Sequence, residues 1–280
     1  MRTPSLPVLL HLILLLALGA PPAIAATHDN TIPTAHRESV ANAEALGRLI
    51  YLHDKAAWLS TDALLAASAF QSPPGQLRGW VTQPGEGDRI SVGYLALVDG
   101  KVVAFARADT WPASGGTANA RRLPVPDSLT PAESRLMDAI ALAKATDGPL
   151  NCSNRPWNVV AFDDPGEQDG ILVFLMSPWT NETAPLGGFE MFRIDAEGDT
   201  ILERFTQTHG CVNMPTPDLG KSAALAVTHL TSPSPTAFHV FMSLQYEKPV
   251  YVSTSDGLWV VENGEVAYTG ESAGDDMENE

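Results

Sequence analysis

Residues 90–111, ISVGYLALVDGKVVAFARADTW, decide the fold class that the sequence predicts. Two apolar runs rich in β-branched and aromatic residues flank Asp99-Gly100, a dipeptide typical of two-residue hairpins because both turn positions favour positive φ. Together with GWVTQ at 79–83, this segment predicts an antiparallel meander. Because both faces of the hairpin are apolar, we expect helix or further chain to cover each side of it.

Helices are expected on both sides of this meander. Residues 34–57 carry apolar side chains at helical spacing and predict an amphipathic helix, and residues 61–62 form a candidate cap for a shorter helix that ends at Phe70. After the meander, TPAE at 130–133 matches a capping box with proline at the first helical position. We expect this helix to stop at DGP, residues 147–149.

From residue 151 onward the apolar runs have the length and composition of strands, and FHVFMSL at 238–244 is among them. Turn dipeptides such as Asp256-Gly257 and Asn263-Gly264 separate these runs. Residues 110–129 are rich in glycine, proline and small polar residues, and we interpret them as a linker or excursion. The pattern predicts an α+β fold: a largely antiparallel sheet, an N-terminal amphipathic helix, and a second helix before a β-rich C-terminal half.

The chain is expected to have four parts. Residues 1–25 place one arginine ahead of an apolar run and an A-x-A site, which predicts a signal peptide. Residues 26–129 would form a subdomain of helix and meander, and residues 130–268 a subdomain of helix and further strands; one continuous domain is the alternative. Residues 269–280 are expected to form an acidic disordered tail. No membrane insertion is expected after cleavage, because charges or prolines interrupt every later apolar stretch before it reaches the roughly 20 residues of a spanning helix.

The predicted mature chain is strongly acidic. Removing residues 1–25 takes away Arg2 and no acid, which leaves 16 basic against 33 acidic residues and a formal charge of -17. Nucleic acid and anionic membrane surfaces are therefore not expected as partners. A basic periplasmic or cell-envelope protein would suit this charge, because complementary charge speeds encounter.

Cys152 and Cys211 are the two cysteines of the chain. In an oxidising compartment such a pair predicts one disulfide, which would close a loop of about 60 residues and contribute roughly 4 kcal/mol. The alternative for HGC at 209–211 is a reactive Cys211 activated by His209. Catalytic pairs are normally brought together by the fold, so we expect a structural bridge.

Three histidines of the β-rich half, His209, His229 and His239, are candidate catalytic or metal-binding residues. Three imidazoles suit an open zinc site, but these spacings match no ligand motif, so the sequence predicts no metal and no cofactor. The G-x-S-x-G elbow, the Walker loop and the G-x-G-x-x-G loop are absent from the sequence. Their absence lowers the expectation of a common hydrolase or nucleotide enzyme.

Residues 177–192, SPWTNETAPLGGFEMF, form a candidate binding loop between two apolar runs. Trp179 and Phe189 are its candidate binding residues, and His209 is a third. A tryptophan on a proline-rich loop can anchor a partner surface, and it can equally close the end of a sheet. Both interpretations stay open at this point.

The segments HVFMSLQYEKPVYVSTSDGLWVVENGEV at 239–266 and GGFEMFRID at 187–195, with the two cysteine contexts, resemble a group of uncharacterised exported proteins of proteobacteria. The resemblance spans residues 34–268 and implies a Gram-negative periplasmic setting and a shared fold. It implies no activity and assigns no catalytic residue.

Two functional hypotheses follow from the sequence. The first is an exported, periplasmic or secreted protein without enzymatic activity that binds a protein or a small molecule. The alternative is a periplasmic enzyme that uses His209, His229 or His239 as a base or a ligand, and it requires these side chains to converge on one concave pocket.

Overall fold

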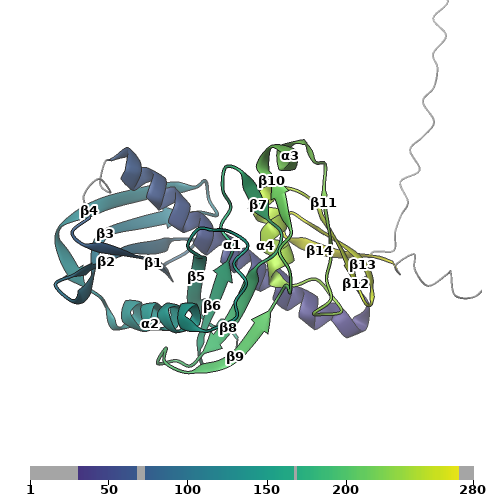
Figure 1. Ribbon diagram of the computed structural model, residues 1–280, viewed down its shortest axis with the longest axis horizontal. Helices are drawn as coiled ribbons and strands as arrows, with labels where there is room; N and C mark the ends of the chain where they lie inside the picture. Colours follow the sequence, from purple (N-terminus) through teal and green to yellow (C-terminus); the bar gives the residue numbers. More distant parts are fainter. Residues whose placement is uncertain (1–30, 68–72, 167–168, 271–280) are drawn as a thin grey trace, which may run out of the picture.

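The computed structural model describes residues 31–67, 73–166 and 169–270. Three four-stranded sheets lie side by side along the long axis of the molecule, and one long helix, α1 (Arg37–Ala66), extends past them (Figure 1). All strand pairs are antiparallel except one pair in the third sheet. The predicted α+β class with a largely antiparallel sheet is confirmed.

The first sheet contains, in spatial order, β1 (Gln76–Pro84), β2 (Ile90–Val98), β3 (Lys101–Trp111) and β4 (Thr117–Ser128). The predicted hairpin turn is confirmed, with φ of 47° at Asp99 and 79° at Gly100. The interpretation of 110–129 as a linker is wrong, because most of it is the edge strand β4. Its prolines are tolerated because they fall where the pairing with β3 skips from Arg122 to Asp127, so their missing N–H groups break no ladder.

The second sheet contains β5 (Asn158–Asp163), β6 (Ile171–Met176), β8 (Phe189–Ile194) and β9 (Ile201–Thr206). Helix α2 (Pro131–Ala145) packs against β5 and β6. Its predicted capping box is confirmed: the Glu133 amide donates to Thr130 Oγ1 at 3.2 Å, and the Thr130 amide donates to Glu133 Oε2 at 2.8 Å. Beside this sheet, β7 (Thr183–Pro185) pairs with β10 (Asn213–Pro215), which leads directly into α3 (Thr216–Lys221).

The third sheet contains β11 (Leu225–Thr228), β12 (Val250–Thr254), β13 (Gly257–Glu262) and β14 (Glu265–Gly270), with β11 and β12 parallel. The prediction of a strand at 238–244 is wrong, because this run lies inside helix α4 (Ala237–Tyr246). Thr236 and His239 form a capping box that starts the helix. Since α4 is buried on most of its sides, its sequence shows a continuous apolar run in place of a helical stripe.

Helix α1 is continuous, so the prediction of a second helix capped at 61–62 is wrong. Thr61 does not cap; its hydroxyl donates to the carbonyl of Ala57 and bonds the hydroxyl of Tyr94 in β2. Against α4 the helix comes very close at Gly47, where a Cβ atom would lie 2.4 Å from Val240 Cβ. The predicted subdomain boundary at 129–130 falls between β4 and α2, and α1 contacts strands on both sides of it.

Several predictions fall outside the described residues. They concern the signal peptide at 1–25, the helix end at Phe70 and most of the acidic tail. The first two residues assigned to that tail, 269–270, belong to β14. Within the described ranges, no helix is long and apolar enough to cross a membrane.

Candidate functional site

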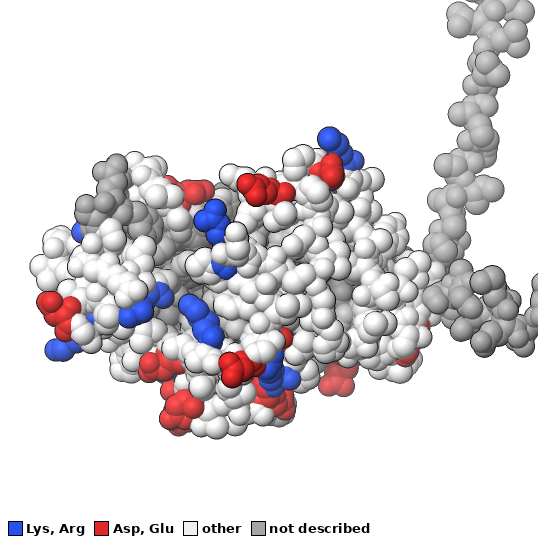
Figure 2. Space-filling view, viewed as in Figure 1, with Lys and Arg blue, Asp and Glu red and all other residues white. Residues whose placement is uncertain are grey.

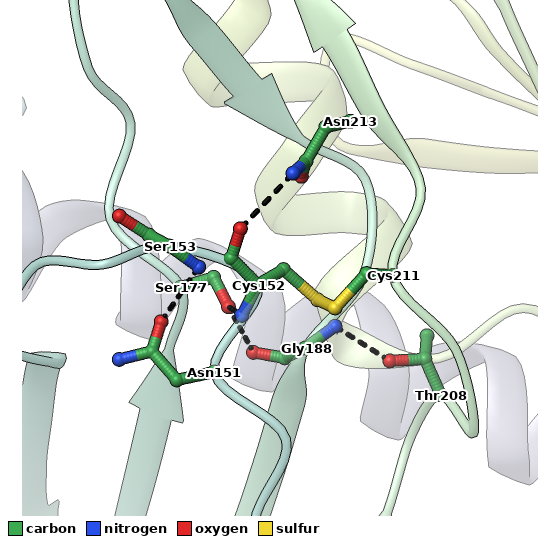
Figure 3. The surroundings of a disulfide bond; sticks show 8 residues. All are labelled: Asn151, Cys152, Ser153, Ser177, Gly188, Thr208, Cys211 and Asn213. Atoms are coloured by element: carbon green, nitrogen blue, oxygen red, sulfur yellow. Dashed lines mark hydrogen bonds between the residues drawn. A yellow bond between two sulfur atoms is a disulfide. The ribbon is translucent and has the colours of Figure 1, made fainter.

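The predicted disulfide between Cys152 and Cys211 is confirmed, with 5.3 Å between the two Cα atoms. It joins the loop before β5 to the loop after β9 (Figure 3). The Asn213 side-chain amide donates to the Cys152 carbonyl at 3.0 Å, and the Cys152 amide donates to Ser177 Oγ at 2.8 Å. The HGC stretch is therefore structural, and Cys211 is not a free nucleophile.

Gly188, the second glycine of the candidate binding loop, lies against this bridge. Its φ of +74° favours glycine, and a Cβ there would lie 2.6 Å from Cys152 Sγ and 2.3 Å from Ser177 Oγ. Its amide donates to Thr208 Oγ1 at 2.7 Å, and its carbonyl accepts from Ser177 Oγ at 3.0 Å. The start of β8 thus packs directly on the disulfide.

The three candidate histidines do not converge. His229 and His239 are buried with ring centroids 4.7 Å apart, whereas His209 is exposed beside the bridge. His239 Nδ1 accepts from the Thr236 amide at 3.0 Å as part of the α4 cap. Burial, with the neighbouring His229, lowers the pKa of His239 to about 3. Among the described residues, no group of three His, Cys, Asp or Glu side chains is arranged to hold a metal ion.

A cleft of about 910 Å³ lies instead between α1, the first two sheets and the end of α4. Six aromatic side chains line it, including four of the six tryptophans of the chain: Tyr51, Trp58, Trp80, Trp157, Trp179 and Tyr246. Its polar lining comprises Asp54, Thr61, Asp62, Asn158, Thr180, Asn181, Thr216, Gln245 and Glu247. The cleft thus combines six aromatic rings with nine polar side chains, three of which are carboxyl groups.

Helix α1 forms one side of the cleft. Residues Tyr51, Asp54, Trp58 and Asp62 follow one another at spacings of three and four, so one helical face presents them together. Trp58 keeps 45% of its surface exposed. The described part of the chain therefore leaves a large aromatic side chain partly uncovered in this cleft.

The other walls come from segments far apart in the sequence. Trp80 comes from β1, residues 156–158 from the loop leading into β5, and residues 178–181 from the loop after β6. Residues 244–247 end α4. Cys152 lies four residues before Pro156, and Cys211 lies five residues before Thr216, which also lines the cleft. The disulfide therefore ties two walls of the cleft to each other.

Asp54 is the carboxyl group that faces the cleft from the deepest position, with 7% of its surface exposed. Burial raises its pKa to about 6, and the hydrogen bond from Asn158 Nδ2 to Asp54 Oδ1, 2.6 Å long, opposes this rise. The described residues offer this carboxyl no other side-chain hydrogen bond and no ion pair. A carboxyl with a raised pKa in a concave site is typical of binding and catalytic positions.

The candidate binding residues are divided between surface and core. Trp179 lines the cleft, with 44% of its surface exposed, its Nε1 donating to Thr216 Oγ1 at 3.2 Å and its ring edge-on to Tyr246. Phe189 is 2% exposed and stacks on Phe238, so it belongs to the core and reaches no surface. His209 lies outside the cleft lining.

The acidic charge of the protein is not gathered into one field on the face shown in Figure 2. Acidic and basic side chains form small separate groups there, with uncharged residues between them. The cleft differs in that its charge has one sign: the described residues that line it include three carboxyl groups and no lysine or arginine.

No protein-family model, curated protein or solved structure matches this chain significantly. The resemblance to exported proteobacterial proteins stays a prediction.

Proposed function

We propose that the chain is an exported binding protein without enzymatic activity, which holds a small ligand in the aromatic cleft. The observation that carries this proposal is the cleft itself, lined by six aromatic side chains of which Trp58 and Trp179 stay nearly half exposed. Its volume of about 910 Å³ falls in the range of small-molecule sites.

The disulfide supports an oxidising compartment, because such bridges are rare where cellular thiols stay reduced. With the apolar leader predicted at 1–25, this favours a periplasmic or secreted protein. A partner of this protein would then be a small molecule of that compartment or of the cell envelope.

The neutral dye N-phenyl-1-naphthylamine tests the proposal, because its fluorescence rises when it enters an apolar site. We expect saturable binding to the full-length protein, weakened at least about fivefold by Trp58→Ala and by Trp179→Ala, since each loses a large aromatic contact. Tyr251→Ala is the matched control, because Tyr251 is similarly exposed at 41% but lies on β12 outside the cleft. Equal dye binding by all four proteins would refute the proposed site.

A second candidate function is acid–base catalysis by Asp54, favoured by its burial and its pKa of about 6. The histidine-based enzyme hypothesis has lost its main support, since His229 and His239 are buried together and His209 lies apart from them. Conversion of bound ligand by the wild type, and its loss in Asp54→Asn without loss of binding, would favour the enzyme over the binding protein.

A further inference from the structure

The cleft presents aromatic rings and a single sign of charge. Asp54, Asp62 and Glu247 line it, and no lysine or arginine does. An anionic ligand would meet three carboxyl groups without a compensating cation. A cationic ligand would be attracted both by the carboxylates and by the faces of the aromatic rings.

We propose that the ligand of this cleft is an organic cation with an alkylated ammonium group, seated on the tryptophan rings with Asp54 as its counter-ion. This inference rests on the proposed function and adds the chemical class of the ligand.

The aromatic lining is suited to such a group. Tryptophan gives the strongest cation–π attraction of the aromatic residues, and rings arranged around a quaternary ammonium are its common functional use. Trp58 and Asp54 are four residues apart on α1, so an aromatic side and a carboxyl lie next to each other on the same helical face. Lys55 Nζ already lies 5.5 Å from the centroid of the Tyr51 ring, so the tryptophan rings are the ones that a ligand cation would use.

Asp54 supplies the second, independent observation. It is 7% exposed, and its one side-chain partner in the described part of the chain is the neutral amide of Asn158. A buried carboxylate without a cation is unfavourable, because desolvation is offset only by a single hydrogen bond. A ligand cation entering the cleft would provide the missing charge.

The chemistry of the lining favours an alkylated ammonium over a primary one. A primary ammonium has three N–H donors and is strongly hydrated, so it needs several acceptors to replace its water. An ammonium group whose N–H groups are replaced by alkyl groups needs no such acceptors, and it gives up little hydration free energy when it lies against aromatic rings. The lining offers six rings against three carboxyl groups.

Binding of this kind depends on pH through Asp54. The titratable groups that face the same cleft are Tyr51 and Asp62 on α1 and Tyr246 and Glu247 on α4. The segments contributed by β1, β5, α3 and the loops bring tryptophan, proline, threonine and asparagine, none of which titrates. With an Asp54 pKa of about 6, the affinity for a cation should be about tenfold weaker at pH 5 than at pH 7.5, because the protonated carboxyl cannot act as a counter-ion.

The test compares acetylcholine with 3,3-dimethylbutyl acetate, in which carbon replaces the charged nitrogen at nearly the same shape. Calorimetry or tryptophan fluorescence at pH 7.5 should give at least about tenfold tighter binding of acetylcholine. In Asp54→Asn this preference should fall at least about fivefold, and the dependence on pH should vanish. Glu262→Gln, an exposed carboxyl on β13 outside the cleft, should change neither.

The outcomes separate this inference from the proposed function. If the naphthylamine dye binds in the cleft but the two esters bind equally, the cation is refuted and the binding function stands. Tighter binding of a neutral chitin tetrasaccharide than of acetylcholine, unchanged in Asp54→Asn, would assign the cleft to saccharides. Absence of dye binding would remove both proposals.

Discussion

Two buried carboxyl groups of this protein are treated in opposite ways. Glu133 is 1% exposed, and its carboxylate accepts hydrogen bonds from both Nη atoms of Arg107 and from the amide of Thr130. Burial would raise its pKa, but the hydrogen bonds from Arg107 and Thr130 outweigh burial and lower it. Asp54 is 7% exposed, has one neutral side-chain partner among the described residues, and has a raised pKa.

Glu190 repeats the pattern of Glu133. It is 1% exposed and accepts from Arg204 Nε at 3.1 Å, Arg204 Nη2 at 3.3 Å and Thr206 Oγ1 at 3.0 Å. The sequence thus supplies an arginine where a buried carboxylate has a structural role. Among the described residues Asp54 has no such arginine, which agrees with the proposal that a ligand cation is its counter-ion.

The largest effect is expected when the disulfide that holds two walls of the cleft around Asp54 is removed. Replacing both Cys152 and Cys211 by serine should lower the free energy of unfolding by about 4 kcal/mol, because the reduced chain regains the entropy that a loop of this length loses on closure. Urea denaturation measures the loss, and dye binding should weaken as two walls of the cleft loosen. Two free thiols per chain in the unfolded, unreduced wild type would contradict the bridge itself.

The second test removes a carboxyl that has its partner. Glu133→Ala should cost about 3 kcal/mol, since it breaks the capping box and leaves the partly buried Arg107 without its main counter-charge. Dye binding should be unchanged, because Glu133 does not line the cleft. Glu265→Ala, whose side chain is 83% exposed and only 4.0 Å from Arg48, is the matched control and should change nothing measurable.

Removing the charge of Asp54 should change the free energy of unfolding in the opposite direction, so that the protein becomes more stable. Asp54→Asn should stabilise the protein by about 3 kcal/mol at pH 7.5, because the folded state then no longer holds a desolvated carboxylate. The raised pKa makes the wild-type carboxyl favourable to folding below pH 4 and unfavourable as the pH rises through 6. The gain should therefore disappear near pH 4, and a loss of stability at pH 7.5 would show that Asp54 is structural.

The smallest expected effect comes from buried histidines. Burial lowers the pKa of His53 to about 4 and that of His239 to about 3, so both add stability above pH 6.5 and lose it as the pH falls toward those values. Between pH 7 and pH 5 the two rings together cost about 4 kcal/mol and Asp54 offsets a little over 1, so we expect a net loss of about 2 kcal/mol in the wild type. The loss should be larger in Asp54→Asn, where no carboxyl offsets it, and thermal unfolding at the two pH values measures both. A wild type equally stable at pH 5 and pH 7 would contradict the burial of these two rings.

Local signals predicted the parts of the fold that depend on few residues. Asp99-Gly100 specifies a hairpin through its backbone preference, and Thr130 with Glu133 specifies a helix start through two hydrogen bonds. Residues 238–244 were predicted as a strand for two reasons. Helix α4 is buried on most sides, so its sequence shows no helical stripe, and its cap uses His239 where a glutamate is usual. Strand β4 is held by its pairing with β3, which its own composition does not reveal.

The cleft was missed because its walls come from six separated segments. One signal was present in the sequence: the apolar positions of α1 repeat at Val40, Ala43, Gly47 and Ile50, and the next position of this repeat is Asp54. A carboxyl at a position reserved for the core points to a site. The sequence did single out Trp179, which lies in the cleft, but Phe189 shows that an aromatic residue on a predicted loop can equally belong to the core.

The path of α1 constrains the order in which the chain can fold during synthesis. Near its beginning, Glu44 accepts a hydrogen bond from the amide of Val266, 222 residues later, and Gly47 packs against Val240. These contacts give the molecule a high contact order, which slows folding and delays the covering of the first helix. The apolar side of the N-terminal half of α1 therefore stays uncovered until nearly the whole polypeptide has been made, whereas its C-terminal half packs on the first sheet. A nascent chain that ends before α4 should depend on chaperones to avoid aggregation.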